Sequence, residues 1–180
     1  MARTKKNQVQ ELRFDEKLVL FKFMQRELGI TDMKQLARQM NLPEEEGINE
    51  STGNTLFIEY FFKQPGCRIP ETKLRVYDEN IRRYTQKIGE NRGGLTWKYF
   101  QYLSLLFTEI YLDRWFSDKE AFQQELTDFL HDEDDRTLGQ IGFQDFDLAK
   151  MNKLAYMSAT GSGKTLILHV NILQFSYYLK

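Results

Sequence analysis

The run Ser158-Ala159-Thr160-Gly161-Ser162-Gly163-Lys164-Thr165 has the residue types and the spacing to hold a phosphate group. Its glycines let the backbone turn so that N–H groups face the phosphates, where a side chain would block their approach. Lys164 can reach the β- and γ-phosphates as a cation, and the Thr165 hydroxyl can bind Mg²⁺. The spacing Gly-x-Gly-Lys-Ser/Thr arises by chance in such a chain with a probability on the order of one in a hundred. The run therefore predicts a phosphate-binding loop.

The residues on either side predict the elements that would position this loop. Lys153-Leu154-Ala155-Tyr156-Met157 is apolar enough for a strand, and residues 166–179 predict an apolar helix. A strand, a glycine-containing loop and a helix follow one another in the order that phosphate binding requires. The strict pattern begins with glycine, and the small residue Ser158 takes that position as a variant. We therefore expect residues 151–180 to begin an α/β domain.

The residues before this segment predict helices. Apolar residues three and four positions apart indicate helices over 11–28, 31–41, 70–89, 96–116 and 117–130. Thr96 and Ser117 are the expected N-terminal caps of the last two. Helix 96–116 is apolar around much of its circumference and should be central to the bundle. Periodicity alone leaves residues 56–62 open between helix and strand. Residues 1–130 thus predict an α-helical domain, and the fold class is mainly α.

The composition of the chain changes at His131-Asp132-Glu133-Asp134-Asp135. Runs of like charge are usually solvated, so residues 131–150 are interpreted as an acidic linker and lead-in. A metal site is the alternative interpretation of these carboxylates. The run lacks the ligand spacing that surrounds a single cation, and this favours the linker.

Composition and charge exclude several classes of protein. The net charge of −1 and the pI of about 6.2 exclude a uniformly basic nucleic-acid coat. No stretch approaches the roughly 18 apolar residues of a membrane span. The basic start of the chain leads into polar residues and not into the apolar core of a signal peptide, so we expect a cytoplasmic protein without a membrane partner. The single cysteine, Cys67, is expected to be packed.

The sequence from Ala159 to Thr165 resembles motif I of superfamily 2 helicases and translocases. The flanks on both sides are similar to those of DEAD/DEAH-box helicases related to the restriction subunit of type III restriction enzymes. Residues 99–103 and 112–116 are similar to the N-terminal helical regions of the same group. The resemblance implies that 151–180 starts a RecA-like domain with ATP and Mg²⁺ as cofactors. It also implies the site residues: Thr160, Gly161, Ser162, Gly163, Lys164 and Thr165 bind the nucleotide, Lys164 is catalytic, and Thr165 holds Mg²⁺.

The function implied by this resemblance is that of an ATP-dependent helicase or DNA translocase, of the kind used in restriction or phage defence. Its partners would be nucleic acid, DNA in particular, and a partner subunit. The second carboxylate box, the coupling motif and the arginine fingers of such enzymes would follow the loop. Because about fifteen residues follow Thr165, we expect the 180 residues to be the N-terminal part of a longer polypeptide and inactive alone. The alternative is a non-catalytic helical module that binds protein or nucleic acid and carries a vestigial loop.

Several other residues could bind a ligand, but each of them also has an ordinary structural role. The basic residues between Lys73 and Arg92 could follow a phosphate backbone, but a solvated helix face is the more common role of such residues. Gln144 could imitate an adenine-reading glutamine, although it lacks the proline and aromatic context of that motif. His169 is expected to be packed or partly exposed, and His131 solvated.

Overall fold

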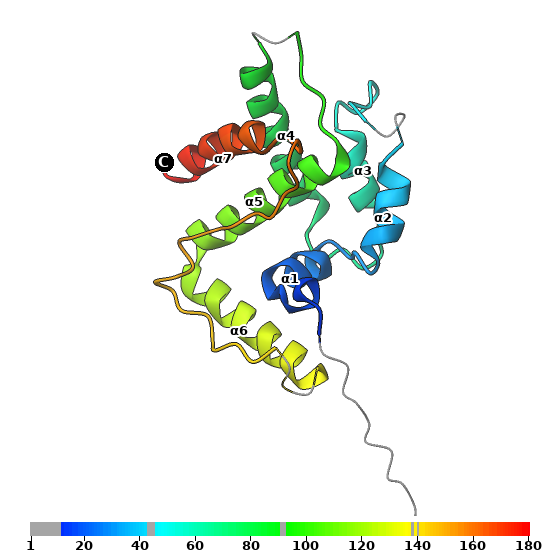
Figure 1. The fold of residues 1–180 in the computed structure, drawn as a ribbon. Coiled ribbons are helices and arrows are strands. Elements are labelled where there is room, and N and C mark those ends of the chain that lie inside the picture. Colours follow the sequence, from blue (N-terminus) through cyan, green and yellow to red (C-terminus); the bar gives the residue numbers. More distant parts are fainter. Residues whose placement is uncertain (1–11, 43–45, 91–92, 138, 140) are drawn as a thin grey trace, which may run out of the picture.

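The computed structural model describes residues 12–42, 46–90, 93–137, 139 and 141–180, and these residues form helices without a strand (Figure 1). The mainly α fold class is confirmed, and residues 56–62 are helical. No helix in the described ranges is both long and apolar enough to span a bilayer. In chain order the elements are a short 3-10 helix, Phe14–Lys17, and then α1 Val19–Glu27, α2 Met33–Met40, α3 Leu56–Phe62, α4 Glu71–Gly89, α5 Tyr99–Ser117, α6 Lys119–Arg136 and α7 Lys164–Tyr178.

Helix α5 lies at the centre of the molecule and contacts α2, α4, α6 and α7. Its residues Leu105, Leu106 and Ile110 are completely buried. Burial of large aliphatic side chains is the main favourable contribution to folding, at about 1.5–3 kcal/mol for each. The central position expected from the apolar circumference of this helix is therefore confirmed.

Two helices begin one or more residues later than the sequence predicted. Helix α5 starts at Tyr99, so Thr96 lies before it and does not cap it. Ser117 is the last residue of α5, and Asp118 caps α6 in its place. The Asp118 carboxylate accepts a hydrogen bond of 2.9 Å from the N–H of Ala121, which satisfies one of the free donors at the start of the helix.

The acidic run continues α6 as far as Arg136, so residues 131–136 form helix and not the expected linker, although His131, Asp132 and Asp135 are exposed as expected. Glu133 is buried, and its Oε2 lies 3.0 Å from Nζ of Lys22 in α1. Asp134 accepts a hydrogen bond of 3.0 Å from the N–H of Ile141 in the following turn. These contacts stabilise carboxylates near the C-terminal end of a helix, where the helix dipole alone would disfavour them.

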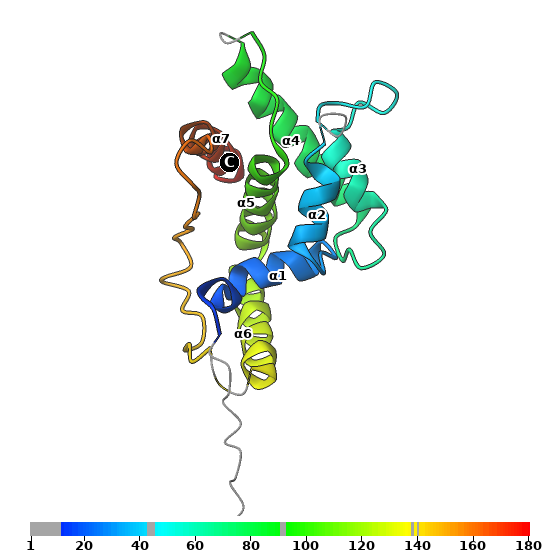
Figure 2. The ribbon, with the colours of Figure 1, turned by 45° about the vertical axis from the view of Figure 1, so that its right-hand side comes forward.

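The lead-in, residues 141–157, runs back along α6 and α5 toward α7 (Figures 1 and 2). The strand expected at 153–157 is not formed, because no other described segment pairs with this backbone. Side chains hold the lead-in instead. The Tyr111 hydroxyl donates to the carbonyl oxygen of Met151 at 2.5 Å, and Nε2 of Gln123 donates to that of Phe146 at 2.5 Å. The lead-in is therefore extended chain tied to two helices.

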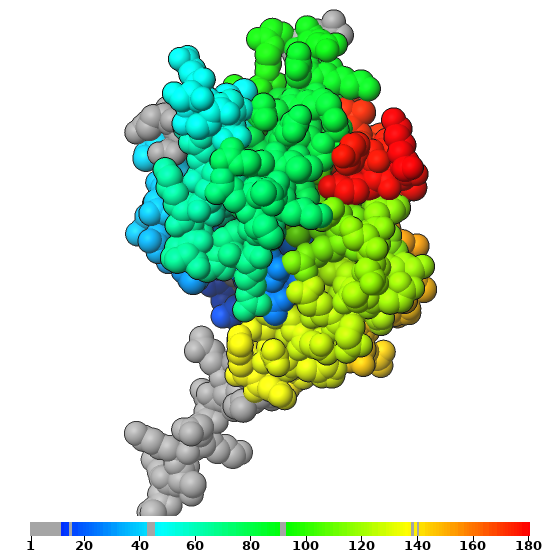
Figure 3. All heavy atoms as spheres, turned by 180° about the vertical axis from the view of Figure 1, so that it is seen from behind, coloured from blue at the N-terminus to red at the C-terminus, as the bar shows by residue number. Residues whose placement is uncertain are grey.

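Helix α7 packs against α4 and α5, and Figure 3 shows it filling the surface beside them. Ile167 and Val170 are buried on that side. An apolar row on its other side, named the α7 stripe, is 47–60% exposed. The stripe consists of Leu168, Ile172, Phe175 and Leu179. The apolar helix expected from the sequence therefore leaves one apolar side uncovered among the described residues.

Candidate phosphate-binding site

Residues 158–165 join the lead-in to α7 and include the first two residues of this helix (Figure 2). Side-chain contacts attach the chain to α5 on both sides of this loop. On the N-terminal side, the Tyr156 hydroxyl lies 2.5 Å from the Oγ1 of Thr108. On the C-terminal side, the buried Gln174 donates from Nε2 to the carbonyl oxygen of Leu105 at 2.9 Å. A helix of the central bundle therefore positions the loop.

The glycines give the loop its shape. Gly161 and Gly163 have φ angles of 79° and 84°, a left-handed conformation that other residues adopt only at a cost. A Cβ at Gly161 would meet no atom within 4 Å, so the backbone conformation alone requires glycine there. A Cβ at Gly163 would lie 2.5 Å from Nε2 of Gln101, so space is restricted as well. Both glycines are required where the sequence predicted them.

The side chain of Lys164 folds back over the loop. Its Nζ donates to the carbonyl oxygens of Ala159 at 2.8 Å and Ser158 at 3.2 Å. Lys164, Thr160 and Thr165 are all exposed. The cation is thus held on the turn itself, with the Thr165 hydroxyl open to solvent in the same first turn of α7.

The start of α7 provides hydrogen-bond donors. The first N–H groups of a helix have no acceptor within it, and they carry partial positive charge. Within the described part of the chain, the N–H groups of Gly163, Lys164 and Thr165 donate to no protein acceptor. The Oγ of Ser162 is buried without a hydrogen-bond partner. Free N–H groups beside a cation suit an anion such as phosphate.

The sequence did not reveal the residue that contacts the loop from α5. Nε2 of Gln101 donates to the carbonyl oxygen of Ser162 at 2.8 Å. The two residues are 61 positions apart, and no local spacing connects them. Only the folded structure brings them together.

Most of the basic side chains of α4 contact neighbouring groups in the described residues. Lys87 is exposed, and Arg92 lies outside the described residues. The engaged contacts are Lys73 with Asp113 at 2.7 Å, Arg75 with Glu71 at 2.5 Å, Arg82 with Asp78 at 3.0 Å, and Arg83 with the ring of Tyr177 at 5.1 Å.

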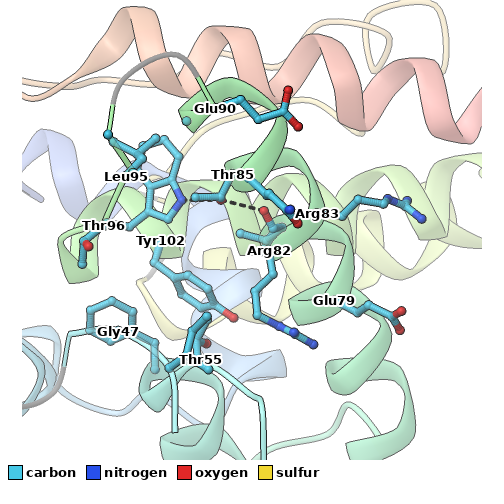
Figure 4. A pocket seen from close by; sticks show the side chains of 18 residues that line it. Gly47, Thr55, Glu79, Arg82, Arg83, Thr85, Glu90, Leu95, Thr96 and Tyr102 are labelled. Atoms are coloured by element: carbon cyan, nitrogen blue, oxygen red, sulfur yellow. Dashed lines mark hydrogen bonds between the residues drawn. The ribbon is translucent and has the colours of Figure 1, made fainter. Parts of the chain in front are cut away.

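Two hollows lie elsewhere, and no loop residue lines either of them. The first, of about 920 Å³, lies between α4 and residues 93–97; in it Arg82 reaches toward Thr55, whereas Arg83 points away (Figure 4). The second, of about 1150 Å³, lies between α1 and the lead-in and is mainly apolar. Gln144 lines this second hollow, so the structure does not bring it to the loop.

The cysteine and the histidines are not part of the loop. Burial raises the pKa of the Cys67 thiol, and its Sγ lies 3.7 Å from the carbonyl oxygen of Ile69, so the thiol is packed. His131 is exposed and lies 2.8 Å from Asp145. His169 is exposed on α7. These placements agree with the structural roles that the sequence favoured.

Comparisons of the chain with models of protein families, with curated proteins and with solved structures found no match. The resemblance to superfamily 2 helicases therefore rests on the loop residues and their flanks. The candidate site is defined by its geometry: a glycine turn, a lysine folded onto it, and the free N–H groups of α7.

Proposed function

We propose that this loop binds the phosphates of Mg²⁺-ATP in an ATP-dependent helicase or DNA translocase. The observation that carries the proposal is the combination of two left-handed glycines, unpaired N–H groups at the start of α7, and Lys164 held over the turn. Backbone N–H groups converging with a lysine are the usual means by which proteins bind polyphosphates.

Each residue of the loop has a role in this proposal. The N–H groups of Gly163, Lys164 and Thr165 bind phosphate oxygens. Lys164 leaves the carbonyl oxygens of Ser158 and Ala159 and pairs with the β- and γ-phosphates, and Thr165 provides an oxygen ligand for Mg²⁺. When bound, ATP supplies the phosphoanhydride bond whose hydrolysis would drive movement along nucleic acid.

The remaining helices have an accessory role in the proposal. Hydrolysis requires a second carboxylate box and arginines that stabilise charge on the transferred phosphoryl group. The helices α1–α6 would support the loop and contact a partner subunit or nucleic acid. We therefore expect the 180-residue chain to bind ATP without measurable turnover.

Lys164→Ala tests the proposal directly. We expect this change to weaken binding of a fluorescent ATP analogue in Mg²⁺ by about tenfold or more, because a charge-assisted hydrogen bond to phosphate is lost. Binding is measured by fluorescence anisotropy, together with the thermal unfolding midpoint without nucleotide. The midpoint should change little, since Lys164 is exposed.

Lys153→Ala is the matched control for this experiment. Lys153 is an exposed cation on the lead-in whose side chain makes no hydrogen bond or ion pair within the described residues. Its removal should leave the affinity within about twofold, as expected for a single distant surface charge. Equal affinities of wild type and Lys164→Ala would refute the proposed site.

The α7 stripe favours a second candidate function, the non-catalytic interaction module. Its residues Leu168, Ile172, Phe175 and Leu179 follow one another at spacings of four, three and four residues and are exposed. This arrangement suits packing against another apolar surface. A chain that binds no ATP analogue but loses a bound protein partner on Ile172→Lys would support the second candidate over the first.

A further inference from the structure

The amide of Gln101 makes two hydrogen bonds that join the loop to the start of α5. Its Oε1 accepts from the N–H of Lys98 at 2.9 Å, which caps the first turn of the helix. Its Nε2 donates to the carbonyl oxygen of Ser162 at 2.8 Å. Gln101 is half-buried: its bond to Ser162 is partly shielded from water, whereas its bond to Lys98 is exposed. The side chain is fixed at one end by α5 and reaches the loop with the other.

The contact with Ser162 determines the direction of a neighbouring donor. No peptide bond in the described residues is cis, so the carbonyl oxygen of Ser162 and the N–H of Gly163 point in opposite directions from the same planar unit. Holding that carbonyl toward Gln101 therefore turns the Gly163 N–H away from α5. This N–H is one of the free donors of the candidate site.

The space around Gly163 shows that the contact is tight. A Cβ at this position would lie 2.5 Å from the Nε2 of Gln101, closer than real Cβ atoms approach. The φ angle of Gly163 is also left-handed. The left-handed conformation favours glycine here, and the short approach shows that the Gln101 amide lies directly against Gly163.

We infer that Gln101 is a positioning residue of the phosphate site: its amide holds the Ser162–Gly163 peptide so that the Gly163 N–H faces the phosphates. This inference rests on the proposed function. It also makes α5 part of the nucleotide site, because a displacement of the start of α5 would turn the same peptide. The helical bundle is thereby mechanically linked to phosphate binding.

Two substitutions remove the donor in different ways. Gln101→Glu keeps an oxygen that can accept from Lys98 N–H but cannot donate to the Ser162 carbonyl, and it adds a charge. Gln101→Met adds no charge but loses the acceptor as well. Loss of the donor to Ser162 is the change that both variants share. An effect present in both is therefore due to that donor.

In both variants we expect weaker binding of the nucleotide and a phosphate loop that is less firmly held. The affinity for the fluorescent ATP analogue in Mg²⁺ should fall by about threefold to tenfold, the range of one partly buried hydrogen bond. Without nucleotide, trypsin should cleave after Lys164 faster than in wild type, by a similar factor. The rate of cleavage reports the loop itself and needs no bound nucleotide.

Gln123→Met and Gln123→Glu are the matched controls. Gln123 is also half-buried, and its Nε2 donates to the backbone carbonyl of Phe146 in the lead-in, away from the loop. These changes should leave the affinity within about twofold. Wild-type affinity and cleavage rate in Gln101→Met, or an equal loss in the Gln123 variants, would overturn the inference.

Failure of the proposed function gives a different result. If wild type binds no ATP analogue, both the proposed function and the role of Gln101 in nucleotide binding are refuted. Cleavage after Lys164 would then still show whether Gln101 holds the loop as a structural contact. If wild type binds and the Gln101 variants bind equally well, only the inference about Gln101 fails.

Discussion

Asp78→Ala is expected to lower the free energy of unfolding by about 3–5 kcal/mol, the cost of breaking a buried charged network by removing one partner. Asp78 is completely buried and accepts four hydrogen bonds. Oδ1 receives the hydroxyls of Thr55 and Tyr102, each at 2.5 Å, and Oδ2 receives the Thr55 N–H and Nε of Arg82, each at 3.0 Å. Burial and the nearby carboxylate raise the pKa of Tyr102, so its phenol stays protonated and donates. Chemical denaturation measures the loss.

Asp113→Ala is the control for this prediction. Asp113 is also an ion-paired aspartate, bound by Lys73 and the hydroxyl of Tyr77, but Lys73 is half-exposed. We expect this change to cost about 1 kcal/mol, as for pairs near the surface. Equal losses in the two variants would show that the Asp78 network contributes no more than a surface pair. Since this network joins the start of α3 to α4 and α5, it also supports the helix that carries Gln101.

The sequence predicted those elements of the fold whose signals are local. Helix α4 was expected over 70–89 and extends over Glu71–Gly89, because its apolar residues repeat at helical spacing between a proline and glycines. Helix α3 could not be assigned from periodicity. Its helical state follows from the cap at Thr55, whose Oγ1 accepts from the N–H of Ile58 at 3.2 Å.

The failures of prediction have a common physical cause: the deciding partner is distant in the sequence. The sequence predicted a linker at the end of α6 because runs of like charge are usually solvated, but Lys22 in α1 pairs with Glu133 from 111 positions away. Residues 153–157 have the composition of a strand but no strand partner among the described residues. Local composition cannot supply either fact.

The candidate site also contains residues that the local sequence predicted and one residue that it could not predict. The glycines, Lys164 and Thr165 could be predicted, because the spacing of a phosphate loop is set within a few residues. Gln101 could not, because its contact with Ser162 depends on how α5 packs beneath the loop. The loop residues provide the chemistry, and the helical bundle provides their orientation.

The interface of α5 with α7 contains a buried carboxyl group that is incompletely paired. Glu109 is fully buried; its Oε2 accepts from Nδ2 of Asn80 at 3.1 Å and from the Tyr178 hydroxyl at 2.9 Å. Its Oε1 and the Oε1 of the neighbouring Gln174 have no partner within the described residues. Burial raises the pKa of Glu109 above its ordinary value, with Arg83 of α4 as the opposing positive charge. Because these two buried oxygens have no donor, a hydrogen-bond donor at this position would be favourable.

Glu109→Gln is therefore expected to stabilise the protein at pH 8, by about 1–3 kcal/mol, the cost of an unsatisfied buried polar group. The amide supplies a donor and removes the buried charge. Because the folded state raises the pKa, it binds a proton more readily than the unfolded chain, so wild type gains stability as pH falls toward the ordinary glutamate value of about 4.3. The difference between variant and wild type should thus shrink between pH 8 and pH 5, as measured by urea denaturation at each pH.

Glu59→Gln is a control for which we expect the opposite change in stability at pH 8. The pKa of Glu59 is lowered, first by its hydrogen bond from Thr52 and then by that from Asn49. Its charged form stabilises the fold above the ordinary pKa, and this contribution is lost as pH falls through the lowered value. Glu59→Gln should therefore be less stable than wild type at pH 8, whereas Glu109→Gln should be more stable. A pH-independent difference for Glu109→Gln would contradict this expectation, because it would mean that Glu109 does not change its charge between pH 5 and pH 8.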